Sequence, residues 1–334
     1  MVKARKYVVK KHFEGLPKRE DFEIVEYELP PIKNGEILVK VEWVSVDPYM
    51  RAYNSRYPTP YDQFGFQVGL VEDSKDPRYP VGTRVVSHKG WCDYTIIDPN
   101  DKNPAAGQVY KLPNLNGLSN SLGVGAVGMP GATAYFGFLE ICQPKAGETV
   151  VVTGAAGAVG SLVGQIAKIK GCKVIGFAGS DDKVQWLEEI GFDKAINYKT
   201  ADVTAALKEA APKGVDCYFD NVGGELSSII INQMNDFGRV SVCGSISSYN
   251  ADPANVPKAP ILQPALVFKQ LKIEGFLVWR WMNRQSEAHT QLIKWIQNGQ
   301  LKPREHITEG FENIFDAFLG ILNGENVGKA VVKL

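Results

Sequence analysis

The stretch TVVVTGAAGAVGSLVGQIAKIK, residues 149–170, predicts a strand, a glycine-rich turn and a helix in direct succession. Thr149–Thr153 is β-branched throughout, which is typical of a parallel strand buried on both faces. Ala158–Lys170 then repeats apolar side chains at helical spacing, and Gly171 ends the pattern. We therefore expect a strand–turn–helix unit, the element from which parallel sheets are built.

The turn holds three regularly spaced glycines, Gly154, Gly157 and Gly160. Their GxxGxxG spacing is related to the GxGxxG pattern, whose glycines allow a tight turn, close approach of backbone N–H groups to a diphosphate, and helix packing. The positive N-terminus of the following helix would face the same diphosphate. Because the glycines stand between a buried strand and a helix, they favour a dinucleotide cradle over a close-packed turn.

Strands and helices alternate along the middle of the chain from about Ala126. The pattern predicts a doubly wound parallel sheet of the Rossmann type. The predicted strands are Lys173–Phe177, Ala195–Asn197, Val215–Asp220 and Arg239–Cys243, and the predicted helices are Asp182–Ile190, Asp202–Ala211 and Glu225–Asp236.

The flanking parts differ in pattern. Up to about Gly125, short β-branched or aromatic runs such as Glu36–Val46 alternate with Pro and Gly turns, which predicts a compact, mostly antiparallel β domain. The last strand, Lys329–Lys333, has no parallel partner nearby, so we expect it to return to that first domain. The predicted domains are residues 1–125, residues 126–303, and residues 304–334 as the return to the first. Toward the C-terminus the sequence predicts a strand over Ile273–Val278, helices over Ser286–Asn298 and Asn313–Leu322, and an irregular stretch over Leu301–Ile307.

Composition excludes several classes of partner. Lys plus Arg and Asp plus Glu both number 37, so no basic excess points to nucleic acid or an anionic membrane. No apolar run is long enough for a membrane span, and the N-terminal residues lack the apolar core of a secretory signal. The scattered cysteines lack CxxC spacing, which predicts a reducing, cytoplasmic location without a disulfide framework.

The end of the second predicted strand bears on the choice of dinucleotide. An NAD site usually carries Asp or Glu there, whereas this chain has Gly179–Ser180 with Lys183 close behind. A hydroxyl and a cation suit a 2′-phosphate, so the sequence favours NADPH. Asp181 and Asp182 leave an alternative, in which either carboxylate caps the next helix.

With these features the chain resembles the zinc-independent branch of the medium-chain dehydrogenase/reductases, within it the alkenal/one and 15-oxoprostaglandin reductases. The motifs that carry the resemblance span nearly the whole chain: SVDPYMR (45–51), GMPGATAYFGF (128–138), GAAGAVGSLVGQIAK (154–168), AGSDDKV (178–184), NYKT (197–200), CYFDNVGG (217–224), CGSISSYN (243–250), WRW (279–281) and ENVGKAVV (325–332). The resemblance implies a GroES-like β domain joined to a Rossmann domain, with the nucleotide in the cleft between them. It also implies NADPH-dependent reduction of the C=C bond of α,β-unsaturated aldehydes and ketones, including 15-oxoprostaglandins.

Site residues follow from the same resemblance. The implied NADP(H)-binding residues are Gly157, Ala158, Val159, Gly160, Ser180, Lys183, Tyr198, Asn221, Cys243, Gly244, Ser245, Ile246, Phe276, Leu277, Val278 and Asn326. Tyr249 and Tyr49 are the candidate catalytic residues. The hydroxyl of Tyr249, or a ribose hydroxyl of the cofactor, could hydrogen-bond the oxygen on which enolate charge develops, and Tyr49 could line the pocket or serve only in packing. One segment departs from the family pattern: Tyr61–Ser74 carries the bulky Phe64 and Phe66, which alters the expected mouth of the substrate pocket.

The sequence gives little support for a metal site or for nucleophilic catalysis. Where the zinc alcohol dehydrogenases place a cysteine, this chain has Val46–Asp47–Pro48, and where they place a His-Glu pair it has Phe66–Gln67. The four histidines are not paired at ligand spacing, and there is no GxSxG motif. We therefore expect no metal.

Two alternative functions remain open. One is NADPH:quinone oxidoreduction, which uses the same cofactor, and the other is a nucleotide-binding relative without turnover. The exposed sheet edge predicted at Ile273–Val278 could pair across a two-fold axis, so we also expect a homodimer.

Overall fold

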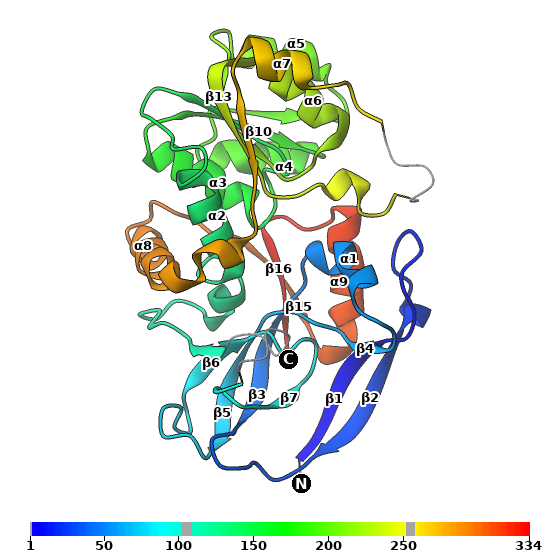
Figure 1. The fold of residues 1–334 in the computed structure, drawn as a ribbon. Helices are drawn as coiled ribbons and strands as arrows, with labels where there is room; N and C mark the ends of the chain where they lie inside the picture. The colour runs from blue at the N-terminus through cyan, green and yellow to red at the C-terminus, as the bar shows by residue number, and fades with distance from the viewer. Residues whose placement is uncertain (1, 102–108, 252–257) are drawn as a thin grey trace. The chain divides into compact units, whose positions relative to one another are not determined.

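The computed structural model describes residues 2–101, 109–251 and 258–334 (Figure 1). The chain forms two compact units. Unit 1 comprises Met1–Gly125, Glu305–Asn326 and Ala330–Leu334, and unit 2 comprises Ala126–Arg304 and Val327–Lys329. Residues 327–329 therefore group with the second unit, whereas the sequence pattern assigned them to the return.

Unit 2 contains a parallel sheet. Its strands are β9 (Thr149–Val152), β10 (Lys173–Ala178), β11 (Lys194–Asn197), β12 (Val215–Asp220), β13 (Met234–Val242) and β14 (Lys272–Gly275). In the described residues six strands pair in the order β11-β10-β9-β12-β13-β14, and every recorded pairing is parallel. The β9 valines are fully buried, as expected for a central strand covered on both faces. The predicted Rossmann fold is confirmed.

Helices connect these strands. The connecting helices are α3 (Gly160–Ile169), α4 (Asp181–Glu189), α5 (Val203–Ala210), α6 (Gly224–Asn232) and α7 (Gln263–Phe268), while α2 (Met129–Leu139) precedes β9 and α8 (Gln285–Gln297) follows β14. Helix α3 begins at Gly160 and not at Ala158, because the preceding residues form the turn. The predicted helix over Glu225–Asp236 is wrong at its end, since Met234 pairs with Val215 as the start of β13.

Two antiparallel sheets are found among the described residues of unit 1. One pairs β2 (Phe22–Leu29), β1 (Val2–Val9) and β4 (Tyr61–Asp62). The larger follows the order β15-β16-β3-β5-β6-β8, with β7 also on β3. Its strands are β3 (Ile37–Ser45), β5 (Gln67–Ser74), β6 (Arg84–Ser87), β7 (Tyr94–Ile97), β8 (Val109–Lys111), β15 (Glu305–Glu309) and β16 (Lys329–Lys333). Strand β16 pairs antiparallel with β3, and β15 occupies part of the stretch predicted as irregular.

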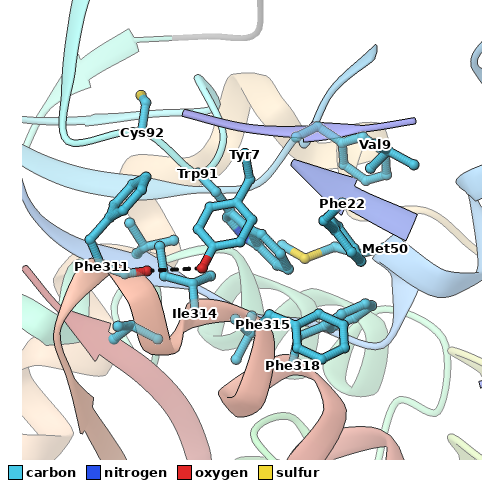
Figure 2. Packing of buried hydrophobic residues seen from close by; sticks show 14 of the residues in the cluster. Tyr7, Val9, Phe22, Met50, Trp91, Cys92, Phe311, Ile314, Phe315 and Phe318 are labelled. Atoms are coloured by element: carbon cyan, nitrogen blue, oxygen red, sulfur yellow. Dashed lines mark hydrogen bonds between the residues drawn. The ribbon is translucent and has the colours of Figure 1, made fainter. Parts of the chain in front are cut away.

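An aromatic core holds the C-terminal return in unit 1. Figure 2 shows Trp91, Phe315 and Phe318 in one cluster with Met50 of α1 (Tyr49–Ala52), and α9 (Ile314–Asn323) supplies the two phenylalanines. The Trp91 and Phe318 rings meet edge to face at 5.4 Å. Fully buried aromatic rings contribute several kcal/mol each, so this core fixes both α9 and α1.

Candidate functional site

The loops that follow the parallel strands of unit 2 gather at one edge of its sheet. Because adjacent parallel strands end on the same side, the turns after β9, β10, β12, β13 and β14 lie along that edge. Strand order reverses between β9 and β12, and open parallel sheets bind ligands at such a reversal. All the cofactor residues predicted from the sequence, except Asn326, fall in or beside these turns or in the segment that follows β11.

The glycine turn after β9 has the close packing that its sequence predicts. Gly154 has a φ of 58°, a left-handed conformation that glycine adopts without strain. A Cβ on Gly160 would lie 2.4 Å from the Gly154 carbonyl oxygen, so only glycine fits there. Gly157 and Ala158 complete the turn, Val159 caps α3, and the first turn of α3 carries no acidic residue. Its positive end is therefore open to an anion.

A segment near the C-terminus supports the same turn, and the sequence pattern did not predict it. The Gly328 N–H donates to the Ala156 carbonyl at 2.8 Å, and Gly157 and Gly328 form a parallel bridge. A Cβ on Gly328 would lie 2.1 Å from the Arg304 carbonyl oxygen. The only available signal was the glycine within the ENVGKAVV motif.

Asp220 organises the loop after β12. It accepts hydrogen bonds from the Val222 and Gly223 N–H groups at 2.9 Å and from the Ser227 hydroxyl at 2.7 Å. Next to it, the Asn221 side chain donates to the Thr153 carbonyl at 2.7 Å. The two loops on either side of the strand reversal are thus tied together, which places the predicted Asn221 beside the glycine turn.

The end of β10 brings together a group of cations. Ser180 precedes α4 and its side chain makes no capping hydrogen bond. Burial and the nearby Lys199 ammonium lower the pKa of Lys183 below its ordinary value. Tyr198 and Lys199 both lie against Gly179, since a Cβ there would come within 3.0 Å of the Tyr198 hydroxyl and 3.2 Å of the Lys199 side chain. Two lysines and a phenol at a strand end suit a phosphate monoester.

Lys199 was not predicted, although it follows Tyr198 in the NYKT motif. The sequence left open whether Asp181 or Asp182 caps α4. The Asp181 side chain accepts a hydrogen bond from the Asn197 amide at 2.7 Å. Asp181 and Asp182 lie in the first turn of α4, where negative charge stabilises a helix.

The loop after β13 folds back on itself through Tyr249. The Ser245 N–H donates to the Tyr249 hydroxyl at 3.2 Å, and a Cβ on Gly244 would lie 3.0 Å from that oxygen. The Cys243 and Gly244 N–H groups bond the Asp220 carbonyl, and Ile246 N–H bonds the Asn221 carbonyl. The Tyr249 hydroxyl is therefore held at the edge of the sheet, where it accepts the Ser245 N–H.

The segment after β14 contributes apolar surface. A Cβ on Gly137 would lie only 2.2 Å from the Phe276 ring, so this ring packs directly against α2. Leu277 is 55% exposed, whereas Val278 is buried and begins a 3₁₀ turn, Val278–Arg284. Of the three predicted residues, Leu277 presents its side chain to solvent.

The remaining two predicted residues belong to unit 1. Tyr49 begins α1, and its hydroxyl lies 3.2 Å from His88 Nε2. Burial raises the pKa of Tyr49 and lowers the pKa of His88 to about 4. Asn326 lines a pocket of about 180 Å³ together with His306, Thr308 and Glu325.

Comparison with known proteins covers the chain from end to end. A family profile described as the N-terminal domain of oxidoreductase matches residues 5–104, and one described as zinc-binding dehydrogenase matches residues 158–298. Prostaglandin reductase 1 of Bos taurus is 49% identical over 100% of both chains. The NADP(+)-dependent 2-alkenal reductase of Nicotiana tabacum is 37% identical over 99% of this chain and 97% of that protein. The crystal structure of CurA in complex with NADPH from Vibrio vulnificus superposes with a TM-score of 0.89, at 36% identity over 98% of each chain.

The residues do not fit the zinc ion that the second profile is named for. Among residues 2–101, 109–251 and 258–334, no group of three or more His, Cys, Asp or Glu side chains is placed to hold a metal. All five cysteines are free thiols, and burial raises the pKa of Cys92 and of Cys243 to about 12. Such thiols are protonated at neutral pH and are poor ligands and nucleophiles. In the same described ranges, no helix is both long and apolar enough to cross a bilayer.

Proposed function

Because the chain belongs to the medium-chain dehydrogenase/reductase family, we propose that it reduces the C=C bond of α,β-unsaturated aldehydes and ketones with NADPH, including the 13,14 double bond of 15-oxoprostaglandins. The observation that carries the proposal is the edge of the parallel sheet in unit 2, where a glycine cradle, two lysines and a phenol meet. Relatives named as prostaglandin and 2-alkenal reductases match the whole chain and support the reaction class.

The edge of the sheet fits NADPH in its details. Gly157, Ala158, Val159 and Gly160 would hold the diphosphate at the start of α3, where the backbone comes close and the helix end is positive. Ser180, Lys183, Tyr198 and Lys199 would hold the 2′-phosphate, which NAD lacks. Asn221, the loop from Cys243 to Ile246, the segment Phe276–Val278, and Asn326 complete the proposed cofactor contacts.

The chemistry needs a hydrogen-bond donor and no metal. NADPH, when bound, supplies a hydride to the β-carbon of the enone, and negative charge then develops on the carbonyl oxygen. The Tyr249 hydroxyl, held as an acceptor by Ser245 N–H, would donate its proton in a hydrogen bond to that oxygen. Tyr49 is the second proposed hydroxyl. The α-carbon takes one proton, from water or a tyrosine hydroxyl, to complete the saturated product.

Finer features of the protein extend this proposal. Its substrates are lipid-derived enals and enones, its location is the cytoplasm, and neither nucleic acid nor a membrane is a partner. Strand β14 ends the order of the parallel sheet, so its outer edge could pair with a second copy in a homodimer.

An NADPH-oxidation assay with four substrates tests the reaction class. A 2-alkenal and a 15-oxoprostaglandin should be reduced at their C=C bonds, as shown by the mass and proton spectrum of the products, whereas a saturated ketone should be inert. Turnover of a quinone alone, with both enones inert, would replace the proposal by quinone reduction. NADPH binding without turnover of any substrate would leave only a nucleotide-binding role.

A further inference from the structure

An aromatic cluster in unit 1 surrounds Tyr49 and involves a histidine to which the proposed function gives no role. The Tyr49 ring stacks on Phe64 at 5.9 Å and meets Tyr53 edge to face at 5.7 Å. Phe64 also stacks on the His88 ring at 6.1 Å, and Phe66 meets the same imidazole edge to face at 4.6 Å. The two bulky residues of the unusual segment therefore clamp one imidazole between them.

Close backbone contacts hold the segments of the cluster in place. Gly65 lies between the two phenylalanines, and a Cβ there would be 2.6 Å from the terminal methyl carbon of Met50. Gly90, with a φ of 84°, approaches so closely that its Cβ would lie 1.9 Å from the Gln63 carbonyl oxygen. The Gly90 N–H donates to the Gly65 carbonyl at 3.0 Å. Gly90 therefore does not tolerate a side chain, and its hydrogen bond to Gly65 ties the segment that carries His88 to the segment that carries the two phenylalanines.

Within this frame the Tyr49 hydroxyl and His88 Nε2 are 3.2 Å apart. Both side chains are half-buried. Burial lowers the pKa of His88 to about 4, and the nearby Asp47 and Lys89 shift it in opposite directions. The imidazole is therefore neutral at neutral pH and carries a single N–H, on one of its two nitrogens.

We propose that His88 is a positioning residue for Tyr49: its Nε2–H donates to the phenol oxygen, so that the Tyr49 O–H is directed at the substrate. The inference rests on the proposed enone reduction, in which a hydroxyl stabilises the developing enolate or protonates the α-carbon. It assigns to His88 a role in turnover that acts only through Tyr49. It also gives Phe64 and Phe66 a reason to be bulky, because their rings fix the orientation of the imidazole.

A double-mutant cycle on kcat tests the pair. His88→Leu should lower kcat for an enone about tenfold and leave the KM for NADPH unchanged, and Tyr49→Phe should lower kcat by at least as much. In the Tyr49→Phe background, His88→Leu should have no further effect, because its role passes through the missing hydroxyl. Tyr27→Phe is the matched control, since Tyr27 donates to the Tyr94 carbonyl at 3.3 Å elsewhere in unit 1. An equal loss from His88→Leu in both backgrounds would overturn the inference in favour of a structural role.

Two further measurements separate this inference from the proposed function. His88→Gln should recover most of the lost kcat, because its amide nitrogen can donate from about the position of Nε2, whereas no recovery would count against the donor role. Nitrogen-15 spectra of the histidine rings should show the proton of His88 on Nε2, with a changed shift in Tyr49→Phe. Wild-type protein that reduces no enone would refute the proposed function, while a proton on Nδ1 or an unchanged His88 signal would refute the pair itself.

Discussion

The sheet edge of unit 2 and the aromatic cluster of unit 1 place chemical groups in different ways. At the sheet edge, backbone N–H groups, glycines and short polar side chains lie at the ends of consecutive parallel strands, so the topology itself collects them. In the cluster, Tyr49 and His88 come from separate segments and meet through the packing of rings and two glycine contacts. The first arrangement follows from the order of the strands, and the second depends on side-chain packing between segments that are distant in the sequence.

The largest effect is expected at the hydroxyl that acts from the sheet edge. Tyr249→Phe should lower kcat for an enone about 10²–10³-fold, the cost typical of removing one oxyanion donor. The affinity for NADPH should fall no more than about fivefold, because the loop loses a single hydrogen bond from Ser245 N–H. Steady-state kinetics and a fluorescence titration measure the two effects.

Tyr135→Phe is the control for that variant, since its hydroxyl donates to Glu287 on the surface of unit 2. A Tyr249→Phe enzyme with unchanged kcat would show that the phenol serves only the loop.

The next largest effect is expected from substitutions in the glycine cradle. Gly160→Ala places a Cβ 2.4 Å from the Gly154 carbonyl oxygen, and strain of about 2–3 kcal/mol should weaken NADPH binding about a hundredfold. Gly157→Ala is the matched comparison, because its Cβ would lie 3.2 Å from the same oxygen and needs only a small shift. Binding is measured by fluorescence titration, with circular dichroism to check folding. Equal losses in the two variants would mean that close packing does not govern the cradle.

The loss of folding stability at acid pH can be compared in the two units, because each contains a histidine whose pKa is lowered by burial. Burial lowers the pKa of His289 in α8, like that of His88, to about 4, below the ordinary value of 6.5. Between these values the unfolded chain binds protons that the folded chain does not, so stability is lost as the pH falls. Each histidine should cost about 2 kcal/mol between pH 7 and pH 5.

Urea unfolding of wild type and His289→Gln at the two pH values checks this sign. The variant should lose less stability on acidification than wild type, and an identical loss would show that His289 titrates normally in the folded state.

The smallest effect is expected at the 2′-phosphate. Lys183→Ala should weaken NADPH binding about tenfold and leave NADH binding unchanged, because only NADPH carries the extra phosphate. Since burial and the Lys199 ammonium lower the pKa of Lys183, NADPH affinity should fall as the pH rises through that lowered pKa. In Lys199→Ala the fall should move to higher pH. Equal loss of NADPH and NADH in Lys183→Ala would contradict the phosphate role.

Prediction from the sequence succeeded where the signal is local. The bounds of β12 and β16 match the predicted strands Val215–Asp220 and Lys329–Lys333, since a run of β-branched and aromatic residues reports burial directly. Helix α2 was missed, because most of its residues are buried and no polar face marks its period. The end of α6 was misplaced because pairing with β12 overrides a helical pattern.

In the candidate site, too, residues with a local sequence signal were predicted and residues brought in by tertiary contacts were not. The strand pattern was enough to name Gly157, Gly160 and Lys183, because each follows a strand whose end the pattern locates. The family resemblance was needed to name Tyr198 and Asn221. The contacts made by Gly328, Lys199 and His88 were not predicted from the sequence. Gly328 lies far along the chain from the glycine turn, and His88 is 39 residues from Tyr49.

By itself, then, the sequence determined the alternation of strands and helices, the glycine cradle, and the lack of zinc ligands at spacing that could form a site. These are properties of neighbouring residues, whose periodicity and backbone freedom act over a few positions. Only the tertiary structure decided that Gly328 braces the cradle and that Phe64 and Phe66 hold His88 against Tyr49. Those contacts depend on how distant segments pack, and close packing is settled by the shape of the whole core rather than by any short pattern.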